Sequence, residues 1–262
     1  MRILRTVSGI RKHIAEARGK GQRVALVPTM GALHEGHLRL VDLARKKTDY
    51  VVMSIYVNPT QFGPKEDFSK YPRTLAQDKK LAEERGVDVI FHPASLYYPD
   101  DSVSVHEREQ SLGRCGASRP GHFDGVATVV AKLFNIVQPD YAVFGQKDGQ
   151  QLDVIERLVR DMHYRIKIIR APIIRDLHGL ALSSRNAYLS AAEYEKAVIF
   201  AQALEHCAKS NGNAAVKNLR KKLADISGLR VDYLEVAGGR LYAAVKIGKT
   251  RLIDNRKIGK AH

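Results

Sequence analysis

Two apolar, β-rich runs separated by a helical stretch constrain the fold of this chain most strongly. The first run covers residues 24–27 and the second covers 50–57, and residues 38–44 between them have the spacing of a helix that buries one face. A strand, a helix and a second strand form a βαβ unit, which belongs in a parallel sheet. Because the second run is mostly apolar, we expect it to be a central strand that is buried on both faces.

The same alternation continues along the chain. Further helices are expected at residues 5–18, 74–85, 126–137 and 152–162, and further strands at 87–91, 141–145 and 166–174. After about Ser190 the pattern changes to two helices, 191–210 and 214–226, and three short β-runs, 231–236, 240–247 and 250–253. Gly238 and Gly239 form a hairpin signal between the first two of these runs.

These elements predict an α/β fold, a Rossmann-like doubly wound parallel sheet with a smaller C-terminal α+β domain. We expect the first domain to span residues 1–175 and the second, a possible lid, to span 176–262. Residues 240–262 carry seven Lys or Arg against one Asp, and we interpret them as a solvated basic tail.

Composition limits the class of protein. With 262 residues, of which 44% are hydrophobic, the chain can bury an ordinary core, and no apolar run approaches the ~20 residues that span a bilayer. The first residues lack a signal-peptide core, so we expect a cytoplasmic protein without a membrane partner. Cys115 and Cys207 are far apart and have no metal-binding context, so neither a disulfide framework nor a metal site is indicated.

The formal net charge is +15, which favours anionic partners. The basic residues are nevertheless spread along the chain, without the aromatic interleaving typical of single-strand binders. We therefore expect no nucleic-acid partner, although a basic nucleic-acid-binding module remains the non-enzymatic alternative.

The stretch Pro28 to His37 is the first candidate site. It follows a strand, contains glycines, and leads into a helix, an arrangement that directs free backbone N–H groups at an anion. His34 and His37 add two donors in an H-x-G-H pattern, which resembles the motif of nucleotidyltransferases and class I aminoacyl-tRNA synthetases. Phosphate is the first ligand to consider, and a zinc pair or two solvated histidines are the alternatives.

Two later loops leave strands at the same edge of the predicted sheet. Gln61 lies in the loop 58–64, where its amide could bind a hydroxy acid or simply satisfy the loop backbone. In the loop 145–151, Gly145 permits close approach of a ligand and Lys147 supplies a charge for phosphate, while Asp148 could cap the next helix or accept from ribose hydroxyls.

A third loop, residues 175–186, is polar and contains Ser183, Ser184 and Arg185. Two hydroxyls and an arginine on a mobile loop suit closure over a triphosphate. A simple domain linker is the alternative, and it would leave these three residues without a shared task.

Six ordered motifs together resemble the pantoate–β-alanine ligase (pantothenate synthetase) family over nearly the whole chain. They are PTMGALHEGH at 28–37, VNPTQF at 57–62, GHFDGV at 121–126, FGQKD at 144–148, LSSRN at 182–186 and TRLIDN at 250–255. The resemblance implies a two-step ligation, in which pantoate and ATP give a pantoyl adenylate and β-alanine then displaces AMP. It also implies a homodimer, and magnesium bound through the ATP phosphates rather than by protein ligands.

The resemblance also assigns roles to residues. His34 and His37 would bind phosphates, with His37 as an acid-like donor, and Lys147 and Arg185 would complete the catalytic group. Gln61 and Gln151 would hold pantoate and β-alanine. The residues expected to bind ATP are Met30, Gly31, His34, Gly36, His37, Gly145, Gln146, Lys147, Asp148, Ile174, Leu182, Ser183, Ser184 and Arg185.

The chain departs from the family pattern at a few positions. Gln146 stands where an acidic residue is usual, Gly149 where an aromatic residue is usual, and Leu182 where Met is frequent, and the segment 236–240 is shortened. The rival enzyme class is a nucleotidyltransferase of similar fold that stops at a CMP- or AMP-linked product.

Overall fold

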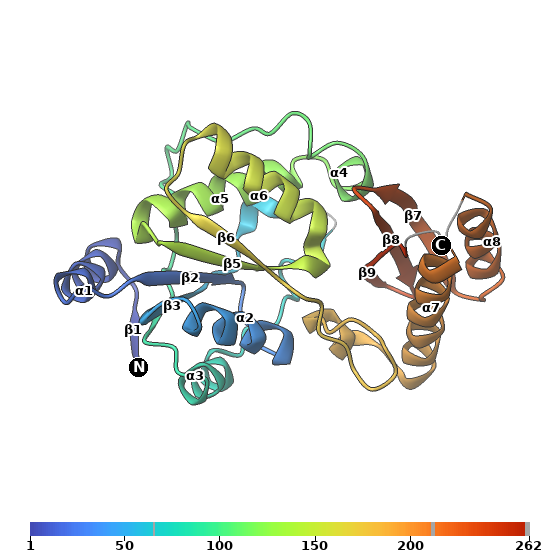
Figure 1. Ribbon diagram of the computed structural model, residues 1–262, viewed down its shortest axis with the longest axis horizontal. Helices are drawn as coiled ribbons and strands as arrows, with labels where there is room; N and C mark the ends of the chain where they lie inside the picture. The colour runs from blue at the N-terminus through green and yellow to red at the C-terminus, as the bar shows by residue number, and fades with distance from the viewer. Residues whose placement is uncertain (65, 211–212, 260–262) are drawn as a thin grey trace.

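A six-stranded parallel sheet forms the larger part of the computed structural model, which describes residues 1–64, 66–210 and 213–259 (Figure 1). The strand order is β1-β4-β3-β2-β5-β6, and every neighbouring pair is parallel. The strands are β1 (Arg2–Leu4), β2 (Val24–Thr29), β3 (Tyr50–Ile55), β4 (Val89–Phe91), β5 (Tyr141–Gly145) and β6 (Lys167–Ala171). The predicted doubly wound α/β sheet is confirmed.

Helices cover both faces of this sheet because the apolar strands bury side chains alternately on each side. On one face α1 (Val7–Gly19), α5 (His122–Val137) and α6 (Gly149–Asp161) pack against residues such as Leu26 and Val52. On the other face α2 (Glu35–Arg45) and α3 (Leu75–Glu84) pack against Val27 and Met53. The carboxyl ends of the strands therefore form one edge that neither layer of helices covers.

Short helical turns follow several of these strands. They are η1 (Pro59–Gln61) after β3, η2 (Gln146–Asp148) after β5, α4 (Arg114–Ser118) before α5, and η3 (Ser184–Tyr188) after β6.

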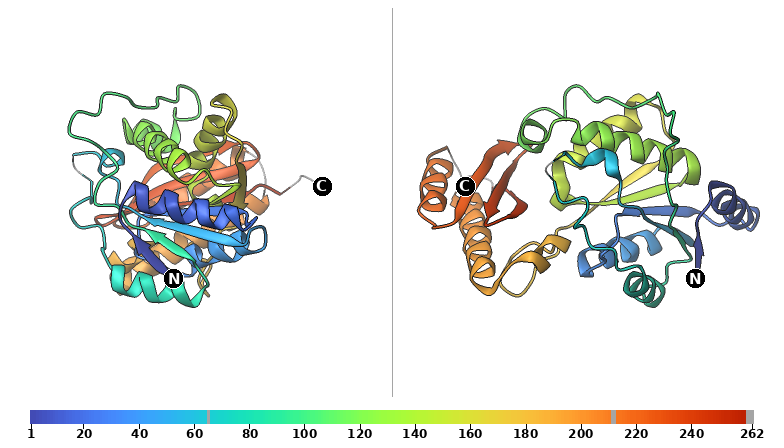
Figure 2. Two further views of the ribbon diagram at one scale, coloured as in Figure 1. Left: turned by 90° about the vertical axis from the view of Figure 1, so that its left-hand side faces the viewer. Right: turned by 180° about the vertical axis from the view of Figure 1, so that it is seen from behind.

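A second, antiparallel sheet follows at the C-terminal end of the chain. It contains β7 (Leu229–Ala237), β8 (Arg240–Ile247) and β9 (Thr250–Lys257), with β8 in the centre. One face buries apolar residues under α7 (Ala191–Ser210) and α8 (Asn213–Ala224), and the other face is turned toward the parallel sheet (Figures 1 and 2). Gly238 and Gly239 have φ values of 53° and 71°, which fits the predicted hairpin.

The prediction of a solvated basic tail at 240–262 is wrong for the residues that the structure describes. β8 is the central strand, and Leu241, Val245 and Ile247 are buried in the core under α7. Among the charged residues of the segment, Arg251 pairs with Asp232 and Arg256 with Glu205, while Lys246 and Lys249 are exposed. Residues 260–262 lie outside the described part of the chain.

Several other elements differ from the prediction. β1 was not predicted, and it pairs with β4 in parallel at the edge of the sheet. The expected irregular stretch 94–125 contains α4 and the first turn of α5, which begins at His122 instead of residue 126. Within the described chain, no helix combines the length and the apolar character needed to cross a membrane.

Candidate active site

Two connected groups of residues form cavities at the uncovered carboxyl edge of the parallel sheet. The smaller cavity, of about 220 Å³, lies beyond β2, β3 and β5, and the larger one, of about 1050 Å³, lies between the two sheets. Residues that line both include Lys147, Asp148 and Arg185, so the two cavities share one wall. Ligands of open α/β sheets bind at this edge.

Most of the predicted site residues meet at the smaller cavity. Those that line it are Met30, His34, Gly36, His37, Gln61, Gly145, Lys147, Asp148, Gln151, Ile174, Leu182, Ser183, Ser184 and Arg185. Gly31 and Gln146 are not among its lining residues. Gly31 lies in the turn before α2, and the backbone carbonyl of Gln146 accepts a hydrogen bond from Asn255 of the C-terminal sheet.

His34 and His37 are fixed by the start of α2. His34 is the N-cap residue, and its Nδ1 accepts from the backbone N–H of Gly36 at 3.1 Å. Nδ1 of His37 in turn accepts from the backbone N–H of His34 at 3.4 Å, which completes a capping box. Since both Nδ1 atoms are acceptors, each neutral ring carries its proton on Nε2. Each histidine can therefore offer a ligand one N–H donor.

Both histidines are neutral at physiological pH. Burial, followed by the nearby charge of Lys147, lowers the pKa of His34 to about 4. Burial, His34 and Lys147 hold the pKa of His37 well below its ordinary value. The two rings lie 4.1 Å apart between centroids, so charging either one would be opposed by the other and by Lys147. Burial and these neighbours therefore favour the neutral form of His37.

Gly36 is needed because of the ring beside it. A Cβ on Gly36 would lie 2.7 Å from Cε1 of His34, closer than two such atoms can approach. The glycine of the H-x-G-H pattern thus allows His34 to fold back over the helix start.

Asp78 holds the turn before α2, a role that the sequence did not reveal. Its side chain accepts from the backbone N–H groups of Ala32 and Leu33 at 3.0 and 2.8 Å, and from the hydroxyl of Thr74 at 3.1 Å. Asp78 is buried, although its charge and its place on a polar helix are typical of a solvated residue. The turn includes Ala32 at a φ of 51°, an uncommon value outside glycine that these hydrogen bonds maintain.

Gln61 is oriented by two neighbours. Its Oε1 accepts from Asn58 at 3.1 Å, and its Nε2 lies 3.2 Å from the sulfur of Met30. The turn that carries Gln61 packs directly on α5, because a Cβ on Gly125 would lie 2.4 Å from the carbonyl oxygen of Thr60. Both contacts of the Gln61 amide are with side chains rather than with the loop backbone, and Gln61 lines the cavity.

His122 and Arg119 also hold the turn that carries Gln61. Nδ1 of His122 donates to the carbonyl of Gln61 at 2.8 Å, so its Nε2 is the acceptor for Arg119, also at 2.8 Å. Burial and the charge of Arg119 lower the pKa of His122 to about 4, in agreement with a neutral ring. Arg119 also pairs with Glu66 through two hydrogen bonds of 2.6 Å. Sequence reasoning assigned none of these three a role, although His122 lies in a quoted motif.

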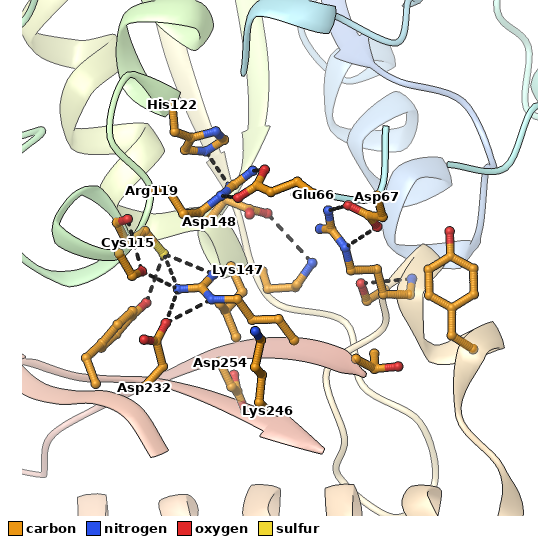
Figure 3. A pocket seen from close by; sticks show the side chains of 18 of the residues that line it. Glu66, Asp67, Cys115, Arg119, His122, Lys147, Asp148, Asp232, Lys246 and Asp254 are labelled. Carbon is orange, nitrogen blue, oxygen red and sulfur yellow. Dashed lines mark hydrogen bonds and ion pairs between the residues drawn. The ribbon is translucent and has the colours of Figure 1, made fainter. Parts of the chain in front are cut away.

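Lys147 and Asp148 lie in η2, at the exit of β5. The ammonium of Lys147 is 3.8 Å from the carboxylate of Asp148. A dashed line marks this ion pair in Figure 3. Asp148 occupies the N-cap position of α6, but its side chain makes no capping hydrogen bond. The capping interpretation of Asp148 is therefore wrong, and its carboxylate faces the cavities.

The loop 175–186 reaches the cavity through η3. Ser183 caps this turn by accepting from the backbone N–H of Arg185 at 3.3 Å, and the hydroxyl of Ser184 lies 3.2 Å from that of Tyr71. Arg185 makes a two-pronged ion pair with Asp67. The alternative of a plain linker is disfavoured, because all three predicted residues line the cavity.

One wall of the smaller cavity is apolar. It is built from α5 and β5 by Val126, Val129, Val130, Leu133 and Phe144. At the floor lies Ser54, whose buried hydroxyl has no hydrogen-bond partner within the described chain. Gln151 opens onto this cavity from α6. The sequence predicted a buried helix at 126–137 but not that its face would line a ligand site.

The departure at Gly149 has a structural counterpart. A Cβ on Gly149 would lie 2.6 Å from the ring of Tyr242, which projects from β8. An aromatic side chain from the C-terminal sheet therefore fills the space beside position 149.

Within the described residues, no group of three His, Cys, Asp or Glu side chains is arranged to hold a metal ion, so nothing favours the zinc alternative.

Fold and site together place the protein among the open α/β enzymes that bind ligands at the carboxyl edge of a parallel sheet. Comparison with known proteins narrows this class. The family model for pantoate-beta-alanine ligase matches residues 2–257, and the chain belongs to this family of ligases.

Individual relatives agree with the family assignment. The chain is 47% identical over 279 aligned positions to the pantothenate synthetase of Sphingopyxis alaskensis, covering 99% of this chain and 100% of the relative. It is also 47% identical over 278 positions to that of Acetivibrio thermocellus, covering 97% and 98% of the two chains.

Two solved structures are similar over their whole length. Pantothenate synthetase from Thermus thermophilus has a TM-score of 0.91 at 40% identity, with 98% of this chain and 99% of that chain covered. Pantoate-β-alanine ligase from Francisella tularensis has a TM-score of 0.89 at 35% identity, with 100% and 99% covered. The Francisella structure is described as a complex with β,γ-ATP and β-alanine.

Proposed function

We propose that this ligase joins pantoate to β-alanine in two steps, with ATP as the activating substrate. In the first step a pantoate carboxylate oxygen bonds to the α-phosphorus of ATP, and the bond to the β-phosphate oxygen breaks and releases pyrophosphate. In the second, the amine of β-alanine bonds to the pantoyl carbonyl carbon, AMP leaves, and the amine loses a proton. The proposal rests on the observation that the predicted phosphate-binding donors and the two glutamines line a single cavity.

The predicted phosphate-binding residues supply neutral and charged donors. His34 and His37 each offer an Nε2–H, and Lys147 adds a mobile positive charge beside them. Transfer to phosphorus requires positioning and charge stabilisation more than a protein nucleophile. A set of fixed donors fits this requirement, and Ser183, Ser184 and Arg185 extend it along the polyphosphate.

The apolar wall and the two glutamines of the cavity fit a branched hydroxy acid. The apolar wall of α5 suits methyl groups, and the amides of Gln61 and Gln151 can bind carboxylate and hydroxyl oxygens. Ser54 lines the same cavity, and its buried hydroxyl has no hydrogen-bond partner in the described chain. This part of the lining supports pantoate as an occupant.

Magnesium would enter with ATP. Asp148 is the only carboxylate among the described residues that line the smaller cavity, and Mg²⁺ commonly combines one or two carboxylates with phosphate oxygens and water. The residues thus fit an ion that is held mainly by the phosphates, with Asp148 beside it. Such an ion neutralises charge on the phosphates.

We further propose that residues 1–175 form the substrate-binding domain and 176–262 a lid. Separate hydrophobic cores under the two sheets and the large cavity between them support this division. A mixed anhydride hydrolyses easily, so a closing domain would protect the intermediate from water.

The proposed function is tested by incubating the protein with ATP, pantoate and β-alanine and measuring AMP and pantothenate. AMP should appear only when pantoate is present, and His37→Ala and Lys147→Ala should each slow the reaction by about 10- to 150-fold, since each removes a donor worth roughly 1.5–3 kcal/mol. AMP release that ignores pantoate would refute the proposal.

A further inference from the structure

The side of the C-terminal sheet that faces the larger cavity carries a group of basic residues that the proposed reaction does not use. Arg230 of β7 and Lys246 of β8 are cross-strand partners, and Lys249 lies in the turn between β8 and β9. All three are exposed and line the cavity of about 1050 Å³. The opposite side of the same strands is apolar and packs under α7.

The charges around this cavity do not balance locally. Five of the six carboxylates that line it are ion-paired, as Glu66–Arg119, Asp67–Arg185, Asp148–Lys147, Asp232–Arg251 and Asp254–Arg175, and the sixth, Glu193, accepts hydrogen bonds from Ser190. Arg230, Lys246 and Lys249 have no carboxylate within 4.0 Å among the residues that the structure describes, and neither has Lys70 on the facing loop. The unpaired positive charge is therefore concentrated on the C-terminal side.

These basic residues share their cavity with Lys147 and Asp148, which also line the smaller cavity. In Figure 3, Lys246 points from its strand into the cavity whose wall also carries Lys147 and Asp148. A concave wall of one charge raises the local concentration of an oppositely charged ligand. Lysine side chains are flexible point charges, which suits an anion that moves through the cavity more than one that is held in a fixed pose.

We propose that Arg230, Lys246 and Lys249, with Lys70 opposite, form a second polyphosphate subsite that binds inorganic pyrophosphate after it leaves the smaller cavity. This inference rests on the proposed function, in which pyrophosphate is a product. The basic residues line a concave cavity that admits a small anion, whereas a nucleic acid would need an open basic surface or groove.

The proposal is tested by calorimetric titration of the full-length protein with inorganic pyrophosphate. The test variant is Lys246→Ala/Lys249→Ala, and the matched control is Lys221→Ala/Lys222→Ala, which removes the same charge from α8, away from the cavity. We expect the test variant to bind pyrophosphate about 5- to 10-fold more weakly, as befits two partly solvated charges, with the difference shrinking at high salt. The control should bind like the wild type.

Pyrophosphate inhibition of the forward reaction provides a second measurement. The test variant should show a higher inhibition constant for pyrophosphate with an unchanged KM for pantoate. Unchanged pyrophosphate affinity in the test variant, or equal weakening in both variants, would overturn the subsite. Binding of a generic oligonucleotide that only the test variant loses, with pyrophosphate binding intact, would assign the surface to nucleic acid instead. Because pyrophosphate is added directly, this titration gives a result even if the wild type makes no pantothenate.

Discussion

Arg185 donates two hydrogen bonds to the carboxylate of Asp67, at 2.9 and 3.0 Å, and both residues line the larger cavity. Burial alone would raise the pKa of Asp67, but the hydrogen bonds and charge of Arg185 hold that pKa below its ordinary value. Glu66, the residue before it, pairs in the same way with Arg119. Two neighbouring carboxylates of one loop thus occupy two arginines from different walls of the site.

Asp67 competes with ATP for Arg185 if that arginine binds the triphosphate. The substitution Asp67→Asn keeps the shape and removes the charge, so we expect ATP to bind about 3- to 10-fold more tightly, which corresponds to one partly exposed ion pair. Equilibrium titration with ATP measures the change, and Asp225→Asn, at an exposed position of the chain, is the control. Weaker ATP binding in Asp67→Asn would show instead that Asp67 holds Arg185 in its binding position.

The three buried histidines give a pH prediction. The pKa values of His34 and His122 are lowered to about 4 and that of His37 is also lowered, so the unfolded chain binds more protons than the folded one below about pH 6.5. The free energy of unfolding should therefore be fully developed above pH 6.5 and fall as the pH drops toward 4. Nuclear magnetic resonance titration of the imidazole signals checks the cause. A midpoint near 6.5 for His34 would contradict the account.

Gly125 sets the position of Gln61. Gly125→Ala would place a methyl group 2.4 Å from the carbonyl oxygen of Thr60, so the turn with Gln61 must shift. We expect a loss of about 1–3 kcal/mol in the free energy of unfolding, together with a higher KM for pantoate. Gly19→Ala is the matched control, because a Cβ there meets no atom within 4 Å. An unchanged KM for pantoate in Gly125→Ala would show that Gln61 does not bind pantoate.

A substitution at Ser54 tests whether this residue of the cavity wall contacts pantoate. If its unpaired hydroxyl binds a pantoate oxygen, Ser54→Ala should raise the KM for pantoate by about 5-fold, the loss expected for one neutral hydrogen bond, and leave the KM for ATP unchanged. Steady-state kinetics at saturating ATP measures the effect. A gain in stability without any change in KM would mean that the hydroxyl has no contact with substrate.

The architecture of the larger sheet was predictable because its strands are short, apolar and separated by amphipathic helices. The meeting of the His34, Gln61 and Lys147 loops followed from one rule, that parallel strands end at the same edge. β1 escaped prediction because three residues give no period, and its strand character comes from pairing with β4.

The missed features depend on contacts between distant parts of the chain. The role of Asp78 could not be predicted because its partners, Ala32 and Leu33, lie more than forty residues earlier. The basic segment 240–257 looked like a tail because charge was weighed above alternation, whereas every second residue of β8 is apolar and buried. The pairing of Arg119 with Glu66 likewise required the folded loop.

The adenylate intermediate is the central claim, and exchange of labelled pyrophosphate into ATP tests it most directly. The protein is incubated with ATP, labelled pyrophosphate and pantoate, without β-alanine. The two-step reaction predicts that label enters ATP only when pantoate is present, and that Lys147→Ala abolishes most of this exchange. Pantothenate formation in the complete mixture by a protein that shows no pantoate-dependent exchange would contradict a free-standing adenylation step.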